Sequence, residues 1–455
     1  MDTESTNYQC PSCGGALRYS ATEGRLLCEY CDSSFTVSEV EAIYAARLDR
    51  TGARDAKACP RTDPPSDAIA AGTTHAVGAD DVTCSLAHDD TAHMRAYTCS
   101  SCAAELVCDV TTAITECPYC GNQAVIPGVL VDEFKPDLVI PFKLDKAAAI
   151  AALSAYYKGK KFLPRAFASN NRIEKIQGVY VPFWLYDAEV VASAKFEATR
   201  TRTYRTEDEE VTETDHYDVY RAGSMSFSRV PVDGSSKMPD AHMDAIEPFD
   251  YDGLVPFSMA YLPGFAADRF DLGQEECRGR AERRIASTME EVLRDTVTGY
   301  DSVCTESCDA EASWQDPEYA LMPVWMLSTT WNGKGFLFAM NGQTGRLIGD
   351  LPIAAGKVIA WFAGIFVVTF SVMAAATSGL GLFSDDRTMR LAAQFGLPAL
   401  VAFLICLMFY SEMKTAKEAA QANAFMRRET FDLTAKSDVF TSTSVTRRKV
   451  ERSDK

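Results

Sequence analysis

The chain has 455 residues and fifteen cysteines, with 45 Lys or Arg against 63 Asp or Glu and a formal net charge of −18. This length allows two to four domains. A disulfide-rich secreted scaffold is excluded, because such scaffolds are short and follow a signal peptide, whereas residues 1–6 are polar and acidic. We therefore expect reduced thiols in the cytosol, eight of them bound to zinc.

Two cysteine segments share one spacing: a Cys-x2-Cys pair, fourteen residues, and a second Cys-x2-Cys pair. An offset of 89 residues maps one segment onto the other and carries Leu17 onto Leu106 and Tyr30 onto Tyr119, so the sequence contains an internal duplication. Four sulfurs placed this way can surround Zn²⁺ and leave no open position, which predicts two structural zinc ions; cysteines without metal are the alternative. The predicted ligands are Cys10, Cys13, Cys28, Cys31, Cys99, Cys102, Cys117 and Cys120.

The segment between the two cysteine clusters has no regular pattern. We expect a first zinc ribbon over residues 1–40, a short helix and a flexible linker over residues 41–96, and a second ribbon over residues 97–131. The linker is rich in Ala, Asp, Thr, Pro and Gly. It also contains His75, Cys84, His88 and His93, for which a solvated loop is favoured over a further metal site.

Residues 132–355 have the composition of a strand-rich α+β domain. We expect a strand over residues 137–144, followed by a helix that Asp145 caps and Gly159 ends. Near the end of the domain, Asn-Gly pairs at Asn332 and Asn341 lie between apolar runs, a pattern that predicts hairpin turns in a meander.

A long hairpin is expected in the middle of this domain, with strands over about 178–205 and 211–221. Its register would place Arg200 opposite Asp215 and Arg202 opposite Glu213, and this pairing explains the two arginines without a ligand.

An amphipathic helix is predicted over about 274–298. Four arginines on it, Arg278, Arg280, Arg283 and Arg284, alternate with glutamates, so a solvated helix face is favoured over a phosphate site. Cys304 and Cys308 follow this helix at a spacing that would allow a shared metal or a disulfide, but they have no partner pair.

Residues 356–411 are predicted to form a transmembrane hairpin. Two runs, 358–376 and 391–410, contain no charged residue. At 1.5 Å per residue each is long enough to cross about 30 Å of hydrocarbon, and buried core helices are the alternative. Basic residues are more frequent outside the hairpin than in its short loop, so both termini are expected in the cytoplasm, in a multi-pass protein of the cell membrane.

Residues 412–455 are expected to form a cytoplasmic tail that begins as an amphipathic helix. Counted from residue 411, the tail has ten Lys or Arg against seven Asp or Glu, and it ends in the basic run 446–449. This excess would allow a weak association with anionic headgroups.

Two stretches of the central domain, Val181-Pro182-Phe183-Trp184 and Met340-Asn341-Gly342-Gln343-Thr344-Gly345, accompany the two ribbons and the two spans. In this order of parts the chain, apart from residues 51–96, resembles a group of bacterial membrane proteins described as zinc-ribbon proteins of the general transcription factor IIB type. Members of that group often carry labels such as RNA polymerase subunit P or replication-restart helicase, and no biochemical role is settled for them. A helicase needs a Gly-x4-Gly-Lys-Ser/Thr loop for phosphates, which this sequence lacks.

We expect a membrane-tethered zinc-binding adaptor whose ribbons recognise a protein partner. Nucleic-acid binding is an alternative, disfavoured because residues 1–131 have eight Lys or Arg against eighteen Asp or Glu. A thiol or zinc redox sensor is another, since zinc-bound thiolates can be oxidised. The sequence contains no zincin helix, nucleophile elbow or dinucleotide fingerprint, so we expect no enzyme. The partner and the oligomeric state do not follow from the sequence.

Overall fold

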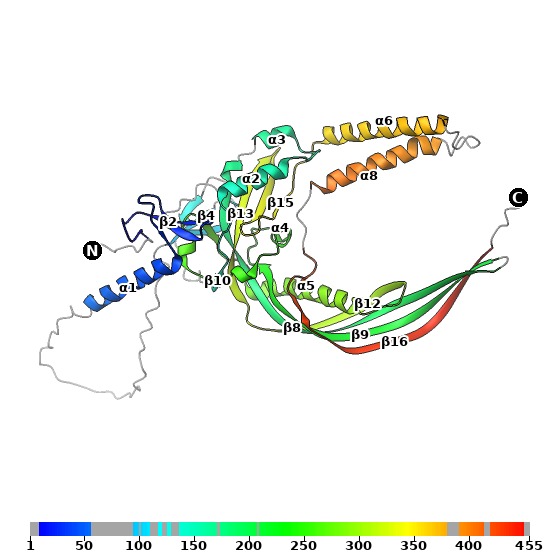
Figure 1. The fold of residues 1–455 in the computed structure, drawn as a ribbon, viewed down its shortest axis with the longest axis horizontal. Helices are drawn as coiled ribbons and strands as arrows, with labels where there is room; N and C mark the ends of the chain where they lie inside the picture. The colour runs from blue at the N-terminus through cyan, green and yellow to red at the C-terminus, as the bar shows by residue number, and fades with distance from the viewer. Residues whose placement is uncertain are drawn as a thin grey trace, which may run out of the picture.

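The computed structural model describes residues 9–55, 94–99, 102–109, 117–120, 125–128, 136–170, 173–206, 209–379, 391–413 and 419–449. Figure 1 shows two cysteine-containing segments at one end, a strand-rich body, a long curved arm of strands and two apolar helices. The multidomain description, with a strand-rich central domain and two apolar helices near the C-terminus, is confirmed at this level.

The first cysteine segment forms a small antiparallel sheet of three strands. These are β1 (Leu17–Ser20), β2 (Arg25–Cys28) and β3 (Ser34–Phe35). Helix α1 (Val37–Asp55) follows and is longer than the short helix predicted here. Thr36 and Glu39 form a reciprocal cap at its start: Glu39 N donates to Thr36 Oγ1 at 3.2 Å, and Thr36 N donates to Glu39 Oε2 at 2.7 Å.

The second cysteine segment is part of the large sheet of the molecule. It contributes β4 (Met94–Cys99), β5 (Glu105–Asp109) and β6 (Val125–Gly128). β5 pairs antiparallel with β11 (Ala266–Asp268), and β11 in turn pairs parallel with β8 (Gln177–Arg205). Cysteine ribbon and body therefore share one sheet of thirteen strands.

The body is built around β8 and β13 (Glu318–Trp331), which pair antiparallel. The remaining body strands are β7 (Leu138–Val139), β10 (Val255–Pro256), β14 (Lys334–Asn341) and β15 (Leu347–Gly349). The predicted meander is confirmed, and its first turn has the positive φ angles of an Asn-Gly hairpin, 50° at Asn332 and 75° at Gly333. The strand expected over 137–144 shrinks to β7, because the amides of Lys143 and Leu144 turn away and donate to Gly342 O.

Helices cover the body and connect its strands. They are α2 (Lys146–Tyr157), α3 (Arg165–Asn170), η2 (Ile173–Lys175), α4 (Asp240–Ala245), η3 (Tyr251–Gly253) and η4 (Met259–Tyr261). Asp145 caps α2 as predicted, since its Oδ1 accepts a hydrogen bond of 2.8 Å from Ala148 N. Gly159, with φ +84°, follows the last turn.

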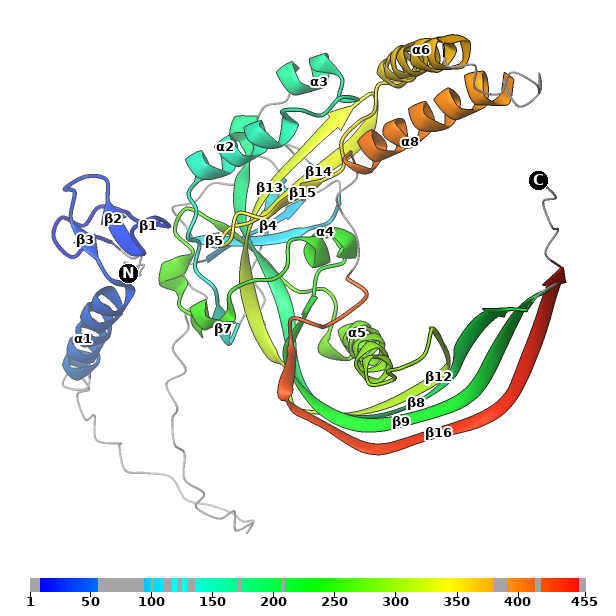
Figure 2. The same ribbon diagram turned by 45° about the vertical axis from the view of Figure 1, so that its right-hand side comes forward.

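The arm is the distal half of β8 together with β9 (Glu209–Asp233), β12 (Ser302–Trp314) and β16 (Met426–Lys449), in the order β16-β9-β8-β12. Its predicted register is confirmed: Arg200 lies opposite Asp215, and Arg202 opposite Glu213. Figure 2 shows α5 (Gln274–Asp295) lying in the concave side of the arm. Alternate alanines of β8, such as Ala192 and Ala194, are buried in the same core as Ala281 and Ile285 of α5.

The chain after the apolar helices differs from the predicted tail. Residues 419–425 are irregular and residues 426–449 form β16, which runs antiparallel along β9 over most of its length. The amphipathic helix expected at the start of the tail is not found in residues 419–425, and residues 414–418 lie outside the described part. The basic run fits a strand because Arg448 lies opposite Glu210 and Lys449 opposite Glu209.

The two apolar runs form α6 (Ala355–Gly379) and, after a short π-helical turn at residues 392–396, α8 (Leu397–Ser411). Both are long and apolar enough to cross a membrane. Within residues 355–377 only Thr377 is buried by the rest of the described chain, unlike in a core helix of a soluble protein. The predicted loop residues 385–390 lie outside the described part.

Candidate metal centres

The first metal centre is formed by two turns of the small three-stranded sheet. Cys10 and Cys13 lie before β1, while Cys28 ends β2 and Cys31 follows it. The Sγ atoms of Cys10 and Cys31 are 3.5 Å apart, as are those of Cys13 and Cys28. Each turn closes with a backbone bond to its first cysteine, and Gly14 supplies a φ of +77° in the first turn.

The second centre repeats this geometry at the predicted offset. Cys99 and Cys120 have Sγ atoms 3.6 Å apart, and those of Cys102 and Cys117 are 3.7 Å apart. Ala103, which the offset pairs with Gly14, has a φ of 56° and donates its amide to Cys99 O at 2.8 Å. The duplication is therefore visible in the backbone as well as in the sequence.

The sulfur positions in both clusters are suited to a tetrahedrally coordinated cation. In each, the four sulfurs lie within 4.8 Å of one another. Four thiolates around zinc at about 2.3 Å would be separated by about 3.8 Å, close to the observed contacts. All eight predicted ligands come together in two groups that could hold a metal ion, and the donor set is consistent with zinc.

The two clusters differ in burial. In the first, Cys13 and Cys31 are exposed, whereas the second has no exposed cysteine. Burial raises the pKa of Cys102 to about 11 and raises that of Cys117 further. In the first cluster the two exposed thiols shift in opposite directions. Hydrogen bonding to Ser33 lowers the pKa of Cys31 to about 6, whereas the pKa of Cys13, although the Gly15 amide opposes the shift, is raised to about 12 by hydrogen bonding to other cysteines. A cation offsets the cost of placing thiolates in a buried site, and by burial this cost is larger for the second cluster.

The second ribbon is packed into the body. Besides the β5–β11 pairing, Tyr119 lies between two of its cysteines and is only 8% exposed. The ring belongs to the same core as Val179 and Met322 of the body. Beneath it, Asp268 at the end of β11 is buried and accepts a hydrogen bond of 2.7 Å from Ser235 Oγ.

The first ribbon packs on the body through side chains, since Leu17 and Tyr19 of β1 lie in the same buried core as Phe142 of the body. Tyr19 N of β1 donates to Pro263 O at 3.2 Å, and the Tyr19 ring meets Tyr261 edge-on with centroids 5.4 Å apart. Between ribbon and body lies a cleft of about 510 Å³, lined among others by Arg18, Lys146 and Trp325. Tyr30, the counterpart of Tyr119, does not line this cleft and is 78% exposed.

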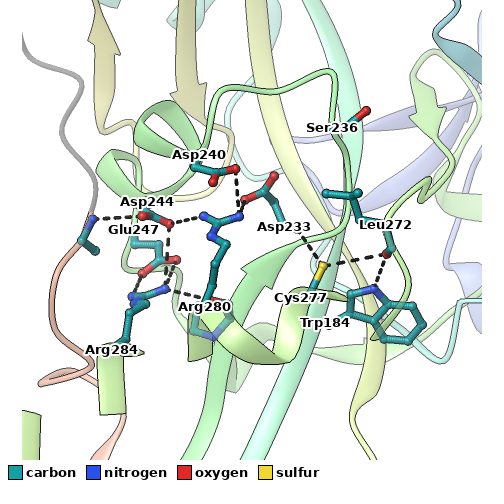
Figure 3. Close-up of polar contacts among 12 residues, drawn as sticks. Trp184, Asp233, Ser236, Asp240, Asp244, Glu247, Leu272, Cys277, Arg280 and Arg284 are labelled. Carbon is teal, nitrogen blue, oxygen red and sulfur yellow. Dashed lines mark hydrogen bonds and ion pairs between the residues drawn. The ribbon is translucent and has the colours of Figure 1, made fainter. Parts of the chain in front are cut away.

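Figure 3 shows a second polar site that the sequence analysis missed. The sequence predicted a solvated face for Arg280 and Arg284 of α5, and this prediction is wrong. Both contact carboxylates, all of them buried except that of Asp240. The contacts of Arg280 are Asp233 at 2.7 Å, Asp240 at 2.9 Å and Asp244 at 3.1 Å, while Arg284 pairs with Glu247 at 2.6 Å and 3.2 Å.

The sequence contains a signal that could have predicted this burial: both arginines are three residues after buried members of the apolar stripe, Cys277 and Ala281. The prediction is correct for Arg278, which pairs with Glu275 at the surface.

This arginine cluster holds the segment that follows α8. Asp244 Oδ2 accepts a bond of 2.9 Å from Ala419 N, and Thr288 Oγ1 accepts one of 2.7 Å from Ala422 N. Four carboxylates face two guanidinium groups, and burial raises the pKa of Asp233 to about 6 although Arg280 opposes the shift. The cluster therefore fastens α4, α5 and the start of the arm strand β16 together.

The remaining candidate residues do not form a site. Cys304 is exposed while Cys308, beyond a bulge at residues 305–307, is partly buried toward α5. His216 is a cross-strand residue 3.2 Å from Ser444 Oγ. The predicted linker residues His75, Cys84, His88 and His93 lie outside the described residues.

The resemblance motifs have structural roles. Buried Asn341 donates to Ile246 O at 3.1 Å and accepts the amides of Gln343 and Thr344 at 2.9 Å each, which shapes the turn before β15. Trp184 Nε1 donates to Leu272 O at 3.0 Å, before α5 (Figure 3).

Comparisons with known proteins give one informative match. No family model matches the chain, and no solved structure does. The transcription factor IIB-type label therefore stays a prediction. The uncharacterised protein YdjG of Bacillus subtilis (strain 168) is 36% identical over 249 residues, which are 55% of this chain and 73% of that protein. The chain belongs to the family of YdjG.

Proposed function

We propose that the chain is a membrane-anchored zinc-binding adaptor of the cytosol and that its first ribbon recognises a protein partner. The supporting observation is the different exposure of two duplicated residues. Tyr119 of the second ribbon is 8% exposed and packed in the body, whereas Tyr30 is 78% exposed. A large aromatic side chain with an apolar ring and a polar tip is a common anchor in protein interfaces.

In this proposal the two metal centres have separate roles. The second zinc ion stabilises the body, because its ribbon shares the large sheet through β5 and β11. The first zinc ion keeps a small ribbon rigid and presents its outer turn, since a fold of this size has little core of its own.

The sheet supports a membrane hairpin with both flanks on one side. β9 precedes the apolar helices in the chain and β16 follows them, yet the two strands pair. If α6 and α8 span the bilayer, they must therefore cross it as a pair and return the chain to the same side. The excess of basic residues outside the hairpin favours the cytosol for that side.

The described part of the first ribbon does not favour nucleic acid as the partner. Both of its arginines are engaged by acidic residues, Arg18 with Glu29 at 3.4 Å and Arg25 with Glu39 at 3.7 Å. Phosphate binding normally requires free cations on one face.

A photo-crosslinking residue at position 30 tests the adaptor proposal in the full-length chain within intact cells. We expect a discrete protein adduct that disappears in a Cys10→Ser/Cys28→Ser background, because the ribbon would no longer hold its turn. A crosslinker at Tyr220, another exposed tyrosine on the arm, is the matched control. The same adducts at both positions, no protein adduct at position 30, or a nucleic-acid adduct there would contradict the proposal.

A further inference from the structure

The loop between α2 and α3 (residues 158–164) contacts both ends of the apolar hairpin. Lys160 Nζ donates to Glu412 O at 2.7 Å, just after the last turn of α8. Lys357 Nζ, at the start of α6, donates to Leu163 O at 2.6 Å. The loop is thus fixed at the level where the two apolar helices leave the body.

Aromatic side chains occupy the same level. Phe162, fully buried, meets the ring of Phe409 of α8 with centroids 5.8 Å apart. Lys161 Nζ lies 5.5 Å from the ring centre of Trp361, in the second turn of α6, and that ring contacts Phe409 at 5.5 Å. Tryptophan beside lysine at the end of an apolar helix is typical of the boundary between hydrocarbon and headgroups.

The charge around this loop is unusual for the chain. Residues 146–173 contain six Lys or Arg and no Asp or Glu, in a protein with an excess of acidic residues. Three of the cations, Lys158, Lys161 and Arg165, are exposed, and none of the described acidic side chains pairs with them. They form a surface with free positive charge next to the hairpin, which we call the basic collar.

The predicted basic tail is in a different situation. Arg448 and Lys449 are incorporated in β16 and lie opposite Glu210 and Glu209. Their charges have acidic neighbours within the sheet, so they are a weaker headgroup site than the basic collar.

We propose that the basic collar binds the phosphate groups of anionic lipids in the cytosolic leaflet. The proposal extends the proposed function and rests on its membrane hairpin. Cations next to a spanning segment are attracted to an anionic leaflet, and Lys160 and Lys357, whose ammonium groups bond to carbonyls, hold the collar in place.

Lipid retention by the full-length protein tests the proposal. The protein is reconstituted in nanodiscs that contain phosphatidylcholine and phosphatidylglycerol at a ratio of seven to three, and the lipids that stay bound after ejection are identified by native mass spectrometry. We expect phosphatidylglycerol to be enriched over the input ratio. The variant Lys158→Ser/Lys161→Ser/Arg165→Ser should lower that enrichment about ten-fold.

The control variant Arg447→Ser/Arg448→Ser/Lys449→Ser removes three cations from the arm and should keep the enrichment. The thermal unfolding midpoint in phosphatidylcholine alone shows whether either variant is folded. Equal enrichment in the collar variant and wild type, or no enrichment in wild type, would overturn the lipid proposal. So would loss of a bound acidic protein in the collar variant with unchanged lipids. Extraction of the wild-type chain from membranes by alkaline carbonate would instead contradict the hairpin itself.

Discussion

The two ribbons carry the same cysteine spacing and the same turn, but they relate to the body differently. In the second, β5 extends the large sheet by pairing with β11, and Tyr119 is part of the body core. In the first, the three strands form a sheet of their own that packs on the body through side chains around Tyr19, and Tyr30 faces solvent. The same cysteine spacing therefore occurs in one ribbon that is part of the large sheet and in another that forms a separate sheet with an exposed outer tyrosine.

Both ribbons contact the same segment of the body, residues 263–268. β1 of the first ribbon reaches Pro263, and β5, its counterpart in the second, reaches residues 266–268. The position equivalent to Tyr19 is Cys108, which is buried opposite Ala266. At this position the first ribbon packs a buried tyrosine ring against Tyr261, whereas the second has a cysteine within a strand of the large sheet.

Loss of the second metal centre should have the largest effect on the body. We expect Cys99→Ser/Cys117→Ser to lower the thermal midpoint of the body by more than about 10 °C, because metal binding supplies much of a ribbon's folding free energy and this ribbon belongs to the sheet. Tryptophan fluorescence follows this transition. Cys10→Ser/Cys28→Ser is the matched variant and should shift the midpoint by only a few degrees. Equal shifts would remove the distinction between the ribbons.

The duplicated tyrosines give a sharper comparison without touching a ligand. Tyr119→Ala should cost about 3–5 kcal/mol of unfolding free energy, as for other buried aromatic rings. Tyr30→Ala should stay within about 0.5 kcal/mol, since its ring is exposed. Urea unfolding of the two variants side by side measures the difference. A cost above about 2 kcal/mol for Tyr30→Ala would mean that this ring is not free.

The arginine cluster allows a pH test of the body's independence from the first ribbon. The pKa of Asp233, raised to about 6 by burial, exceeds the value of about 3.9 for an unfolded aspartate, so the folded state binds more protons between these values. The contribution of Asp233 to the unfolding free energy should then fall by about 1 kcal/mol from pH 5 to pH 6.5, in addition to that of Glu247, whose pKa burial raises to about 7. Asp233→Asn should make the fall smaller by about 1 kcal/mol, while Cys10→Ser/Cys28→Ser should leave it unchanged. An unfolding free energy of the wild type that does not change between pH 5 and pH 6.5 would disprove the raised pKa of Asp233.

The smallest effect concerns the turn that the ribbons share. Ala103→Gly should stabilise the body by about 0.5 kcal/mol, because a residue with a Cβ is strained at positive φ. Gly14→Ala meets no neighbour within 4 Å but introduces that strain, and should weaken zinc binding of the first ribbon about five-fold. Calorimetry and zinc competition measure the two effects. Changes of the opposite sign would show that the turns are not equivalent.

Local patterns in the sequence predicted much of this fold. The eight cysteines, the capping residue Asp145, the register of Arg200 opposite Asp215 and the Asn332 turn all follow from spacing or turn chemistry, which act over short distances. The apolar helices follow from composition alone.

Long-range pairing was not predictable in the same way. β16 is polar and alternates weakly, and it becomes a strand because β9 offers a long open edge to a segment about two hundred residues away. Burial of Arg280 depends on acidic residues that other loops bring to α5. Likewise, nothing in the cysteine spacing distinguishes the ribbon that joins the sheet from the one that does not.

Hydrogen–deuterium exchange of the full-length chain tests the difference between the ribbons most directly. With Cys99→Ser/Cys117→Ser, we predict faster exchange in β11 and in residues 177–186 of β8. With Cys10→Ser/Cys28→Ser, faster exchange should be confined to the first ribbon and residues 259–265. Protection of β11 and β8 in the first variant, or its loss in the second, would contradict the assignment of one ribbon to the body and the other to recognition.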